Sequence, residues 1–285
     1  MGKFDDALRK AKAGKNRSAD NPGSSKVVKI PREEIDSLRL DTEEQKALEQ
    51  PKRTPFNGRI DPKLACLEDP SSAAAECFKT LRSKIMVGKS EKLCRAIMVT
   101  GAQPLDGKSL VAANLAVSIA QGINHYVLLV DCDLRRPTLH KTFGLHVERG
   151  LREYLEDGAS VAPYLLKTPV NKLTLLPAGK PIASPSELLG SEKMHLLIQE
   201  IRNRYKDRFI IFDTPPAHFI ADTAFLADVL DGVVLVVRSG RTNAELAKEV
   251  IESMGKENIL GVVFNATNEA SREYRYYYKY YQNKA

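Results

Sequence analysis

The feature that most constrains the fold is a series of short, almost uninterrupted apolar runs that alternate with longer segments of helical pattern. Each run is strand-length and rich in Val, Ile and Leu, which is typical of strands covered on both faces. The six runs are residues 96–100, 126–130, 173–176, 209–212, 232–237 and 259–264. The helical segments are expected at residues 110–121, 186–205, 222–230 and 243–254. This alternation predicts an α/β fold with three layers, in which a mostly parallel sheet carries helices on both faces.

The segments outside this pattern differ in composition and set the expected domain boundaries. Residues 1–68 mix charged residues with prolines and contain two short helix-like patches, so they predict a flexible charged leader. The first patch, residues 4–13, is either a small surface-binding helix or a solvated helix without a partner. Residues 69–270 form the expected α/β domain. Residues 271–285, SREYRYYYKYYQNKA, hold six of the ten tyrosines without a helical or strand period, which predicts a mobile tail.

Composition and charge argue against several classes of protein. The longest apolar runs, such as residues 233–237, are far shorter than the roughly 20 residues of a membrane-spanning helix. The N-terminus lacks the apolar core and cleavage site of a secretory signal, so the chain is expected to stay in the cytosol. The net charge of +7 is spread among many acidic residues, and no nucleic-acid partner is expected. The cysteines show no CxxC pair and no zinc-ligand spacing: Cys66, Cys77, Cys94 and Cys132.

A phosphate-binding loop follows the first expected strand. The run VTGAQPLDGKS leads into an Ala-rich helical segment and fits GxxxxGK[ST], except that Ala102 occupies the first glycine position. Gly107 lets the backbone close on an anion, Lys108 reaches the β and γ phosphates of a nucleotide, and Ser109 binds Mg²⁺. The sequence therefore predicts a P-loop NTPase fold with ATP and Mg²⁺ as cofactors. The expected ATP contacts in this run are Gln103, Asp106, Gly107, Lys108, Ser109 and Leu110.

Aspartates follow two later strands, at the sheet edge where open α/β sheets bind ligands. Asp131 and Asp133 alternate in extended chain, so both carboxylates face one side and converge on the metal and the γ phosphate. Asp213, in FIIFDTPP, is the expected holder of Mg²⁺, directly or through water. A lone aspartate at such a place is as often a helix cap or turn residue, but the P-loop favours the functional reading. Arg135 and Arg136 either neutralise the transferring phosphate or form surface ion pairs.

These motifs together resemble the bacterial tyrosine autokinases that accompany regulators of exopolysaccharide or capsule chain length. The resemblance runs from about residue 69 to the C-terminus. It rests on VTGAQPLDGKS, LLVDCDLRRP, SPSELLGSEKM, FIIFDTPP with the following ADTAFLADVLDGVVLVVRSGRT, and the tyrosine tail. It implies a protein-tyrosine kinase that phosphorylates its own C-terminal tyrosines, with the tail of one subunit entering the site of its neighbour, in the control of polysaccharide synthesis and export.

The resemblance also implies roles for individual residues. The implied catalytic residues are Lys108, Asp131 and Asp133, with Asp131 as the candidate base. The implied Mg²⁺ site consists of Ser109, Asp131 and Asp213. Asn265 stands where family members contact the adenine base, although an Asn at the end of a strand is as often a turn residue. The implied phosphate acceptors are Tyr274, Tyr276, Tyr277, Tyr278, Tyr280 and Tyr281.

Assembly and partners are implied in the same way. Family members pack into a ring, an octamer, through a helix with Glu, Arg and Arg at three-residue intervals, and Glu76, Lys79 and Arg82 match it here. Lys79 lacks the planar bidentate fork of the usual arginine. Leu105 and Asp106 stand where family loops usually have Gly and Glu. The implied partners are a separate transmembrane adaptor and a tyrosine phosphatase. The adaptor would hold the protein at the inner face of the plasma membrane.

Two other classes of protein share parts of this pattern. Nucleotide-switched positioning ATPases of plasmid partition and cell division share the fold and the aspartate pair, but they usually carry a lysine where this chain has Gln103. A scaffold that uses the tyrosines only for recognition is a third class, since aromatic residues interleaved with basic ones stack on single-stranded nucleic acid. The tyrosine tail favours the kinase over the positioning ATPase. Lys108 and the three aspartates argue against the scaffold.

Overall fold

The computed structural model of the chain describes residues 58–87, 94–157, 160–205, 207–217 and 226–267. All of them belong to the unit formed by residues 50–285. The expected tyrosine tail and most of the expected leader lie outside the described residues. Among the described residues, no helix combines the length and the apolar character needed to cross a bilayer.

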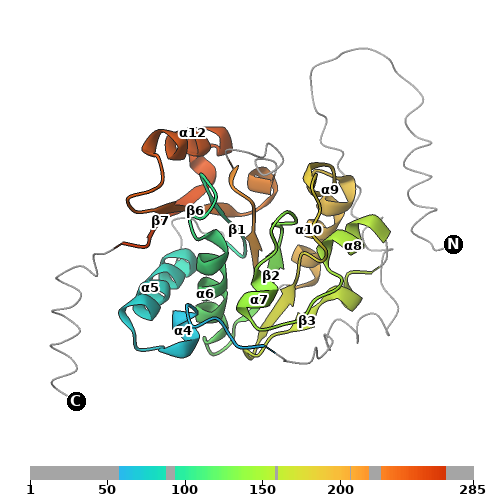
Figure 1. Cartoon of the computed structure of the whole chain (residues 1–285), viewed down its shortest axis with the longest axis horizontal. Helices are drawn as coiled ribbons and strands as arrows, with labels where there is room; N and C mark the ends of the chain where they lie inside the picture. Colours follow the sequence, from blue (N-terminus) through green and yellow to red (C-terminus); the bar gives the residue numbers. More distant parts are fainter. Residues whose placement is uncertain (1–57, 88–93, 158–159, 206, 218–225, 268–285) are drawn as a thin grey trace, which may run out of the picture. The chain divides into compact units, whose positions relative to one another are not determined.

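Within the described part of the chain, seven strands form one sheet (Figure 1). Their order across the sheet is β3-β4-β2-β5-β1-β6-β7, and every neighbouring pair is parallel except β3 with β4. The six expected strands are confirmed with ends that differ by at most one residue, and the two-residue β3 was not expected. The strands are β1 (Ala96–Gly101), β2 (Tyr126–Asp131), β3 (Leu166–Lys167), β4 (Leu173–Leu176), β5 (Arg208–Asp213), β6 (Gly232–Arg238) and β7 (Ile259–Asn265).

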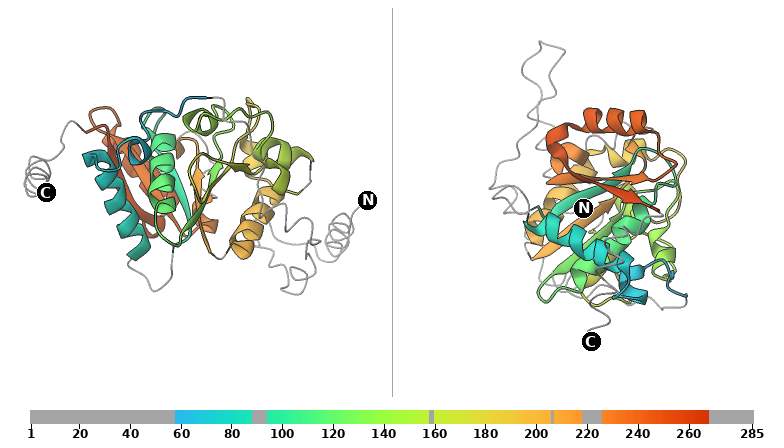
Figure 2. Two further views of the ribbon diagram at one scale, coloured as in Figure 1. Left: turned by 90° about the horizontal axis from the view of Figure 1, so that it is seen from below. Right: turned by 90° about the vertical axis from the view of Figure 1, so that its left-hand side faces the viewer.

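Helices cover both faces of the sheet, as expected, with α5 and α6 on one side and α10 on the other (Figure 2). The helix expected at 186–205 is divided at Gly190 into α9 and α10, and the hydroxyl of Ser191 caps α10 by accepting from the Met194 amide. The α-helices with both ends described are α4 (Ala65–Glu68), α5 (Ala73–Val87), α6 (Lys108–Ala120), α7 (Leu139–Thr142), α8 (Leu151–Asp157), α9 (Ser186–Leu189), α10 (Glu192–Arg204) and α12 (Ala244–Met254). Residues 226–229, within the helix expected at 222–230, are helical as well. The 3₁₀ turns described in full are η1 (Ala162–Tyr164) and η3 (Lys256–Asn258).

The main core lies between the sheet and α6. All six residues of β1 are buried, and every second one, such as Ile97 and Val99, packs in the core cluster with α6. Helix α6 is buried almost all round from Val111 to Ala120, so it shows no polar face. This packing fixes the start of α6 rigidly above the end of β1.

The described end of the expected leader is packed instead of flexible. Leu64 is fully buried and Cys66 is 1% exposed, both in the core cluster that contains α6. The Asn114 side chain of α6 accepts from the Cys66 amide at 3.2 Å and donates to the Lys63 carbonyl at 3.1 Å. Residues 58–68 therefore extend the folded core toward the N-terminus.

The order of the strands indicates which end of the sheet binds a ligand. From β1 the chain crosses by way of α6 to β2, whereas from β6 it crosses by way of α12 to β7 in the opposite direction. Parallel strands that separate in opposite directions leave a crevice at their carboxyl ends. The expected P-loop and aspartates all lie at that edge.

Candidate active site

The P-loop joins β1 to α6 and depends on two residues with left-handed backbone. Gly107 has φ of 94° and directly precedes α6, and a Cβ atom there would lie 2.0 Å from the Asn265 side chain. Leu105 has φ of 69° and a side chain that is 61% exposed. For a leucine this conformation is strained, whereas a glycine would adopt it freely. The loop thus brings the unpaired amides at the start of α6 to the sheet edge, where they suit phosphate.

Asp106 holds the loop from within. It is fully buried, and its carboxylate accepts a hydrogen bond from the Gln103 amide at 3.0 Å and another from the Thr242 hydroxyl at 2.7 Å. The same carboxylate lies so near Gly101 that a Cβ there would approach one of its oxygens to 2.9 Å. The side chain of Asp106 is directed into the protein and shapes the loop, and the expected contact of this residue with ATP stays a prediction.

Residues from the ends of β6 and β7 complete this support. Arg238 donates to the Leu105 carbonyl at 3.0 Å, and the Asn265 side chain donates to the Asp106 carbonyl at 2.8 Å. The Gln103 side chain donates to the Arg241 carbonyl at 3.1 Å. We call the four supporting residues the P-loop anchor: Arg238, Arg241, Thr242 and Asn265.

Among the four residues of the P-loop anchor, only Asn265 was expected from the sequence to belong to the site. The other three lie at or just after the end of the buried strand β6, at the carboxyl edge of the sheet, and this position is the signal that could have indicated them. The side chain of Asn265, which was expected to contact the adenine base, donates a hydrogen bond to the P-loop.

Asp131 and Asp213 come together at the ends of neighbouring strands. They are paired in the parallel register of β2 and β5, and both are fully buried. Asp131 accepts from the amides of Asp133 at 3.1 Å and Leu139 at 3.4 Å. Burial raises the pKa of Asp131 well above its ordinary value, and the neighbouring Asp213 raises it further. The two hydrogen bonds from backbone amides lower the pKa of Asp131.

The carboxylate of Asp213 is the least satisfied group in the site. Neither of its oxygens has a hydrogen-bond partner among the described residues, although the nearby Ser109 hydroxyl acts to lower its pKa. Burial dominates and raises the pKa of Asp213 to about 7, against the opposing effects of Ser109 and the Lys108 ammonium. Lys108 itself is 6% exposed. Two buried carboxylates without a full set of donors suit a bound cation.

Asp133 is more accessible than Asp131. It is half-buried, and one of its oxygens accepts from the Arg136 amide at 3.0 Å. Both arginines that follow it, Arg135 and Arg136, are exposed. Asp133 is therefore oriented by the backbone while it remains open to an incoming group.

The donor set fits magnesium bound together with a nucleotide. Within the described residues, no group of three or more His, Cys, Asp or Glu side chains could hold a metal by itself. Mg²⁺ typically takes one or two protein carboxylates and completes its shell with water and substrate phosphates. Ser109, Asp131 and Asp213 supply the hard oxygen atoms that such a site requires, and the orphaned oxygens of Asp213 are consistent with it.

The three residues expected to join subunits lie on α5, apart from this site. Glu76 and Lys79 form an ion pair within the helix, and Lys79 also donates to the Pro70 carbonyl at 2.9 Å. Arg82 donates to the Ser118 carbonyl near the end of α6, at 2.6 Å. Ser118 is ten residues beyond Lys108, about 15 Å along the helix. Arg82 thus binds α5 to α6 within one chain.

Comparisons with known proteins agree with this geometry. The model of the CobQ/CobB/MinD/ParA nucleotide binding domain matches residues 97–284. The chain is 36% identical to the tyrosine-protein kinase YwqD of Bacillus subtilis (strain 168) over 222 residues, which cover 77% of this chain and 92% of the relative.

Two solved structures are similar at the level of the fold. The chimerical protein CapA2B2 has a TM-score of 0.67 at 32% identity, covering 79% of this chain and all of that one. The kinase domain of the Escherichia coli tyrosine kinase ETK has a TM-score of 0.65 at 28% identity, covering 73% of this chain and 82% of that one. The chain belongs to the CobQ/CobB/MinD/ParA nucleotide-binding family and, within it, to the bacterial protein-tyrosine kinases.

Proposed function

We propose that this kinase transfers the γ phosphate of ATP to the tyrosines of its own C-terminal tail, residues 271–285. The observation that carries the proposal is the convergence at one sheet edge of the P-loop amides with the buried Asp131 and Asp213. Six tyrosines in a fifteen-residue segment outside the α/β pattern supply acceptors close to the domain in sequence.

The chemistry is an in-line displacement. A tyrosine oxygen forms a bond to the γ phosphorus, the bond from that phosphorus to the β–γ bridging oxygen breaks, and ADP leaves. A tyrosine hydroxyl has a pKa of about 10, so its proton must pass to a nearby base during transfer. Asp131 and Asp133 are the candidates for this role. Asp133 is the one open to solvent, whereas Asp131 is buried and engaged by two amides.

Lys108 and the metal would stabilise the transferring group. The Lys108 ammonium and the amides at the start of α6 would bind the phosphate oxygens. Mg²⁺, held by Ser109, Asp131 and Asp213, would neutralise charge on the β and γ phosphates. The P-loop anchor keeps the loop amides in place, so little reorganisation is needed when ATP binds.

If phosphate is transferred between subunits, the reaction would also control whether the subunits assemble into a ring. The tail carries Arg272, Arg275, Lys279 and Lys284 against Glu273. Each phosphate adds a charge of about −1.5 to −2 at neutral pH, so two or three modifications reverse the sign of the tail. This reversal would expel the tail from a neighbour's site and loosen a ring held by Glu76, Lys79 and Arg82.

The cellular role follows from the family resemblance. The kinase would work at the inner face of the plasma membrane, bound to a separate transmembrane adaptor and reset by a tyrosine phosphatase. Cycles of phosphorylation and ring assembly, an octamer in the family, would regulate exopolysaccharide or capsule synthesis and export.

A positioning ATPase of the MinD or ParA kind is the alternative, because the matching family model includes those proteins. Phosphotyrosine mass spectrometry on the purified chain with Mg·ATP and the adaptor's cytoplasmic segment separates the two. Tail phosphotyrosine that disappears in Lys108→Met supports the kinase. ATP turnover without phosphotyrosine supports the positioning ATPase.

A further inference from the structure

Strand β7 forms one edge of the sheet (Figure 1). Among the described strands it pairs only with β6. The Asn265 carbonyl accepts from the Ser239 amide at 2.9 Å, so the peptide groups of the odd-numbered residues of β7 face β6. The peptide groups of Leu260, Val262 and Phe264 therefore point to the outer edge, where a further strand could pair with them.

The same three residues expose apolar side chains on one face of β7. Leu260, Val262 and Phe264 are 41%, 40% and 68% exposed, and they alternate with half-buried residues such as Val263, which packs against the core. The strand, ILGVVFN, contains no charged residue and no proline, which are the features that usually prevent an edge strand from pairing with other segments. Both the outer edge and the exposed face of β7 are therefore suited to a covering segment.

The C-terminal tail, residues 271–285, follows β7 after the short connection 266–270. Ala266 has a left-handed φ of 54°, so the chain leaves the direction of the strand directly after β7. A segment that returns antiparallel to the strand it follows needs only a short connection. The tail is also longer than β7, so it can reach along the whole outer edge.

The composition of the tail suits a strand on this edge. Although the tail as a whole has no strand period, Tyr274, Tyr276 and Tyr278 lie on one face when it is extended, with Arg275 and Lys279 on the other. Tyrosine is favoured in strands, and the tail contains neither glycine nor proline. Aromatic side chains opposite aliphatic or aromatic ones stabilise a pair of strands.

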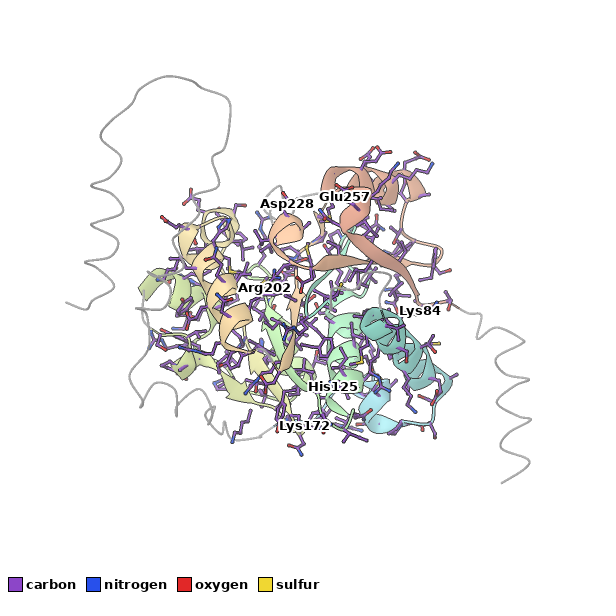
Figure 3. The ribbon with its side chains drawn as sticks, turned by 180° about the vertical axis from the view of Figure 1, so that it is seen from behind. Lys84, His125, Lys172, Arg202, Asp228 and Glu257 are labelled. Carbon is purple, nitrogen blue, oxygen red and sulfur yellow. The ribbon has the colours of Figure 1, made fainter. Side chains whose placement is uncertain are left out.

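The charge of the tail is opposite to that of the segment before β7. Residues 244–258, from α12 through η3, carry four glutamates against two lysines, and all six side chains are exposed. One of the glutamates, Glu257, lies in η3 directly before β7 (Figure 3). The tail carries four basic residues against one glutamate. Electrostatic attraction therefore favours the tail near this edge of the sheet.

We propose that the tail docks as an antiparallel strand on the outer edge of β7 of its own chain, with its even-numbered tyrosines over the exposed apolar face. A register that places Tyr274 opposite Phe264 also places the next two even-numbered tyrosines opposite Val262 and Leu260. The docking does not depend on the kinase reaction. A phosphate on one of these tyrosines would bring charge onto an apolar face and would weaken the docking.

Hydrogen–deuterium exchange of the peptide that contains residues 259–265 tests the proposal. The dephosphorylated full-length chain is compared, without ATP, with a chain that lacks residues 271–285. We expect the amides of Leu260, Val262 and Phe264 to exchange about tenfold more slowly in the full-length chain, because carbonyls of the tail accept from them. The amides of β5, inside the sheet, are the internal control and should exchange equally in both chains.

Phe264→Lys in the full-length chain places a charge on the docking face and repels the basic tail. Its Leu260 and Val262 amides should exchange as fast as those of the chain without the tail. Ile123→Lys is the matched control, since Ile123 is 91% exposed between α6 and β2, and it should keep the slow exchange of the wild type. If Phe264→Lys does not fold, Val262→Lys takes its place.

A mixture separates docking within one chain from docking between two copies. The chain without the tail, whose edge is intact, is mixed with full-length Phe264→Lys, whose tail is intact. Their peptides over residues 259–265 differ in mass, and we expect no slowing of exchange in the chain without the tail. Slowing there would show that a second copy supplies the tail and would overturn docking within the chain. Equal exchange of this peptide in the full-length chain and the chain without the tail would overturn the docking altogether.

Discussion

The hydroxyl of Thr242 donates a 2.7 Å hydrogen bond to the buried Asp106 and accepts one from the Arg238 amide, also at 2.7 Å. Thr242→Val keeps the side-chain shape but leaves a buried carboxylate oxygen without its donor. A lost hydrogen bond to a charged group costs about 1.5–3 kcal/mol, so we expect Mg·ADP to bind about tenfold more weakly. Isothermal titration calorimetry measures this directly.

Thr168→Val is the control for this substitution. The Thr168 hydroxyl donates to the backbone carbonyl of Leu173, in place of a carboxylate, and lies at the far edge of the sheet. It should leave nucleotide affinity unchanged. Equal affinity in Thr242→Val and the wild type would show that the P-loop anchor does not shape the loop.

The carboxylate of Asp213 makes the metal-free protein sensitive to pH. Its pKa is raised from an ordinary value of 3.8 to about 7, so between these values the folded state keeps a proton that the unfolded chain releases. The stability due to this proton is complete below pH 3.8 and is lost as the pH rises through 7. In EDTA, the melting temperature of the wild type should therefore fall relative to Asp213→Asn over this range.

Saturating Mg·ADP should reduce that fall, because a bound cation favours the ionised carboxylate. Thermal melts at several pH values, with and without Mg·ADP, provide the comparison. Melting curves of wild type and Asp213→Asn that shift in parallel with pH would contradict the assignment.

Helix α5 packs on α6 within the chain, and it is also the helix expected to contact a neighbouring subunit. Arg82 donates to the last turn of α6 at 2.6 Å, whereas the Glu76–Lys79 ion pair is partly exposed and contributes about 0–1 kcal/mol. We expect Arg82→Ala to lower the free energy of unfolding by about 1.5–3 kcal/mol, and Lys79→Ala by less than about 1 kcal/mol.

Denaturant unfolding and light scattering on the same samples separate the two roles. Lys84→Ala, an exposed lysine at the end of α5, is the control (Figure 3). If Lys79→Ala dissociates an oligomer without loss of stability, the ring assignment gains support. An Arg82→Ala protein as stable as the wild type would contradict the intrachain role.

At the scale of the whole molecule, the sequence predicted what depends on local pattern. The central strands are buried on both faces, so their apolar runs were visible, and the P-loop showed its fixed spacing. Residues 58–68 were assigned to the leader because their composition is charged and contains proline, and only Leu64 and Cys66 among them are fully buried. The other three residues of the P-loop anchor were not predicted, because contacts such as those of Arg238 and Thr242, which span 133 and 136 residues of sequence, leave no periodic pattern.

The central claim is that the P-loop site of one chain phosphorylates the tail of another. Full-length Lys108→Met, which keeps the tail, is mixed in Mg·ATP with an active variant lacking residues 271–285. Mass spectrometry then searches for phosphotyrosine on the Lys108→Met chain. We predict phosphate on Tyr274 to Tyr281 in the mixture and none in either protein alone. If the wild type incorporates tail phosphate but the mixture does not, transfer between chains is contradicted. If the wild type itself acquires no tail phosphotyrosine, the proposal that this kinase phosphorylates its own tail is contradicted.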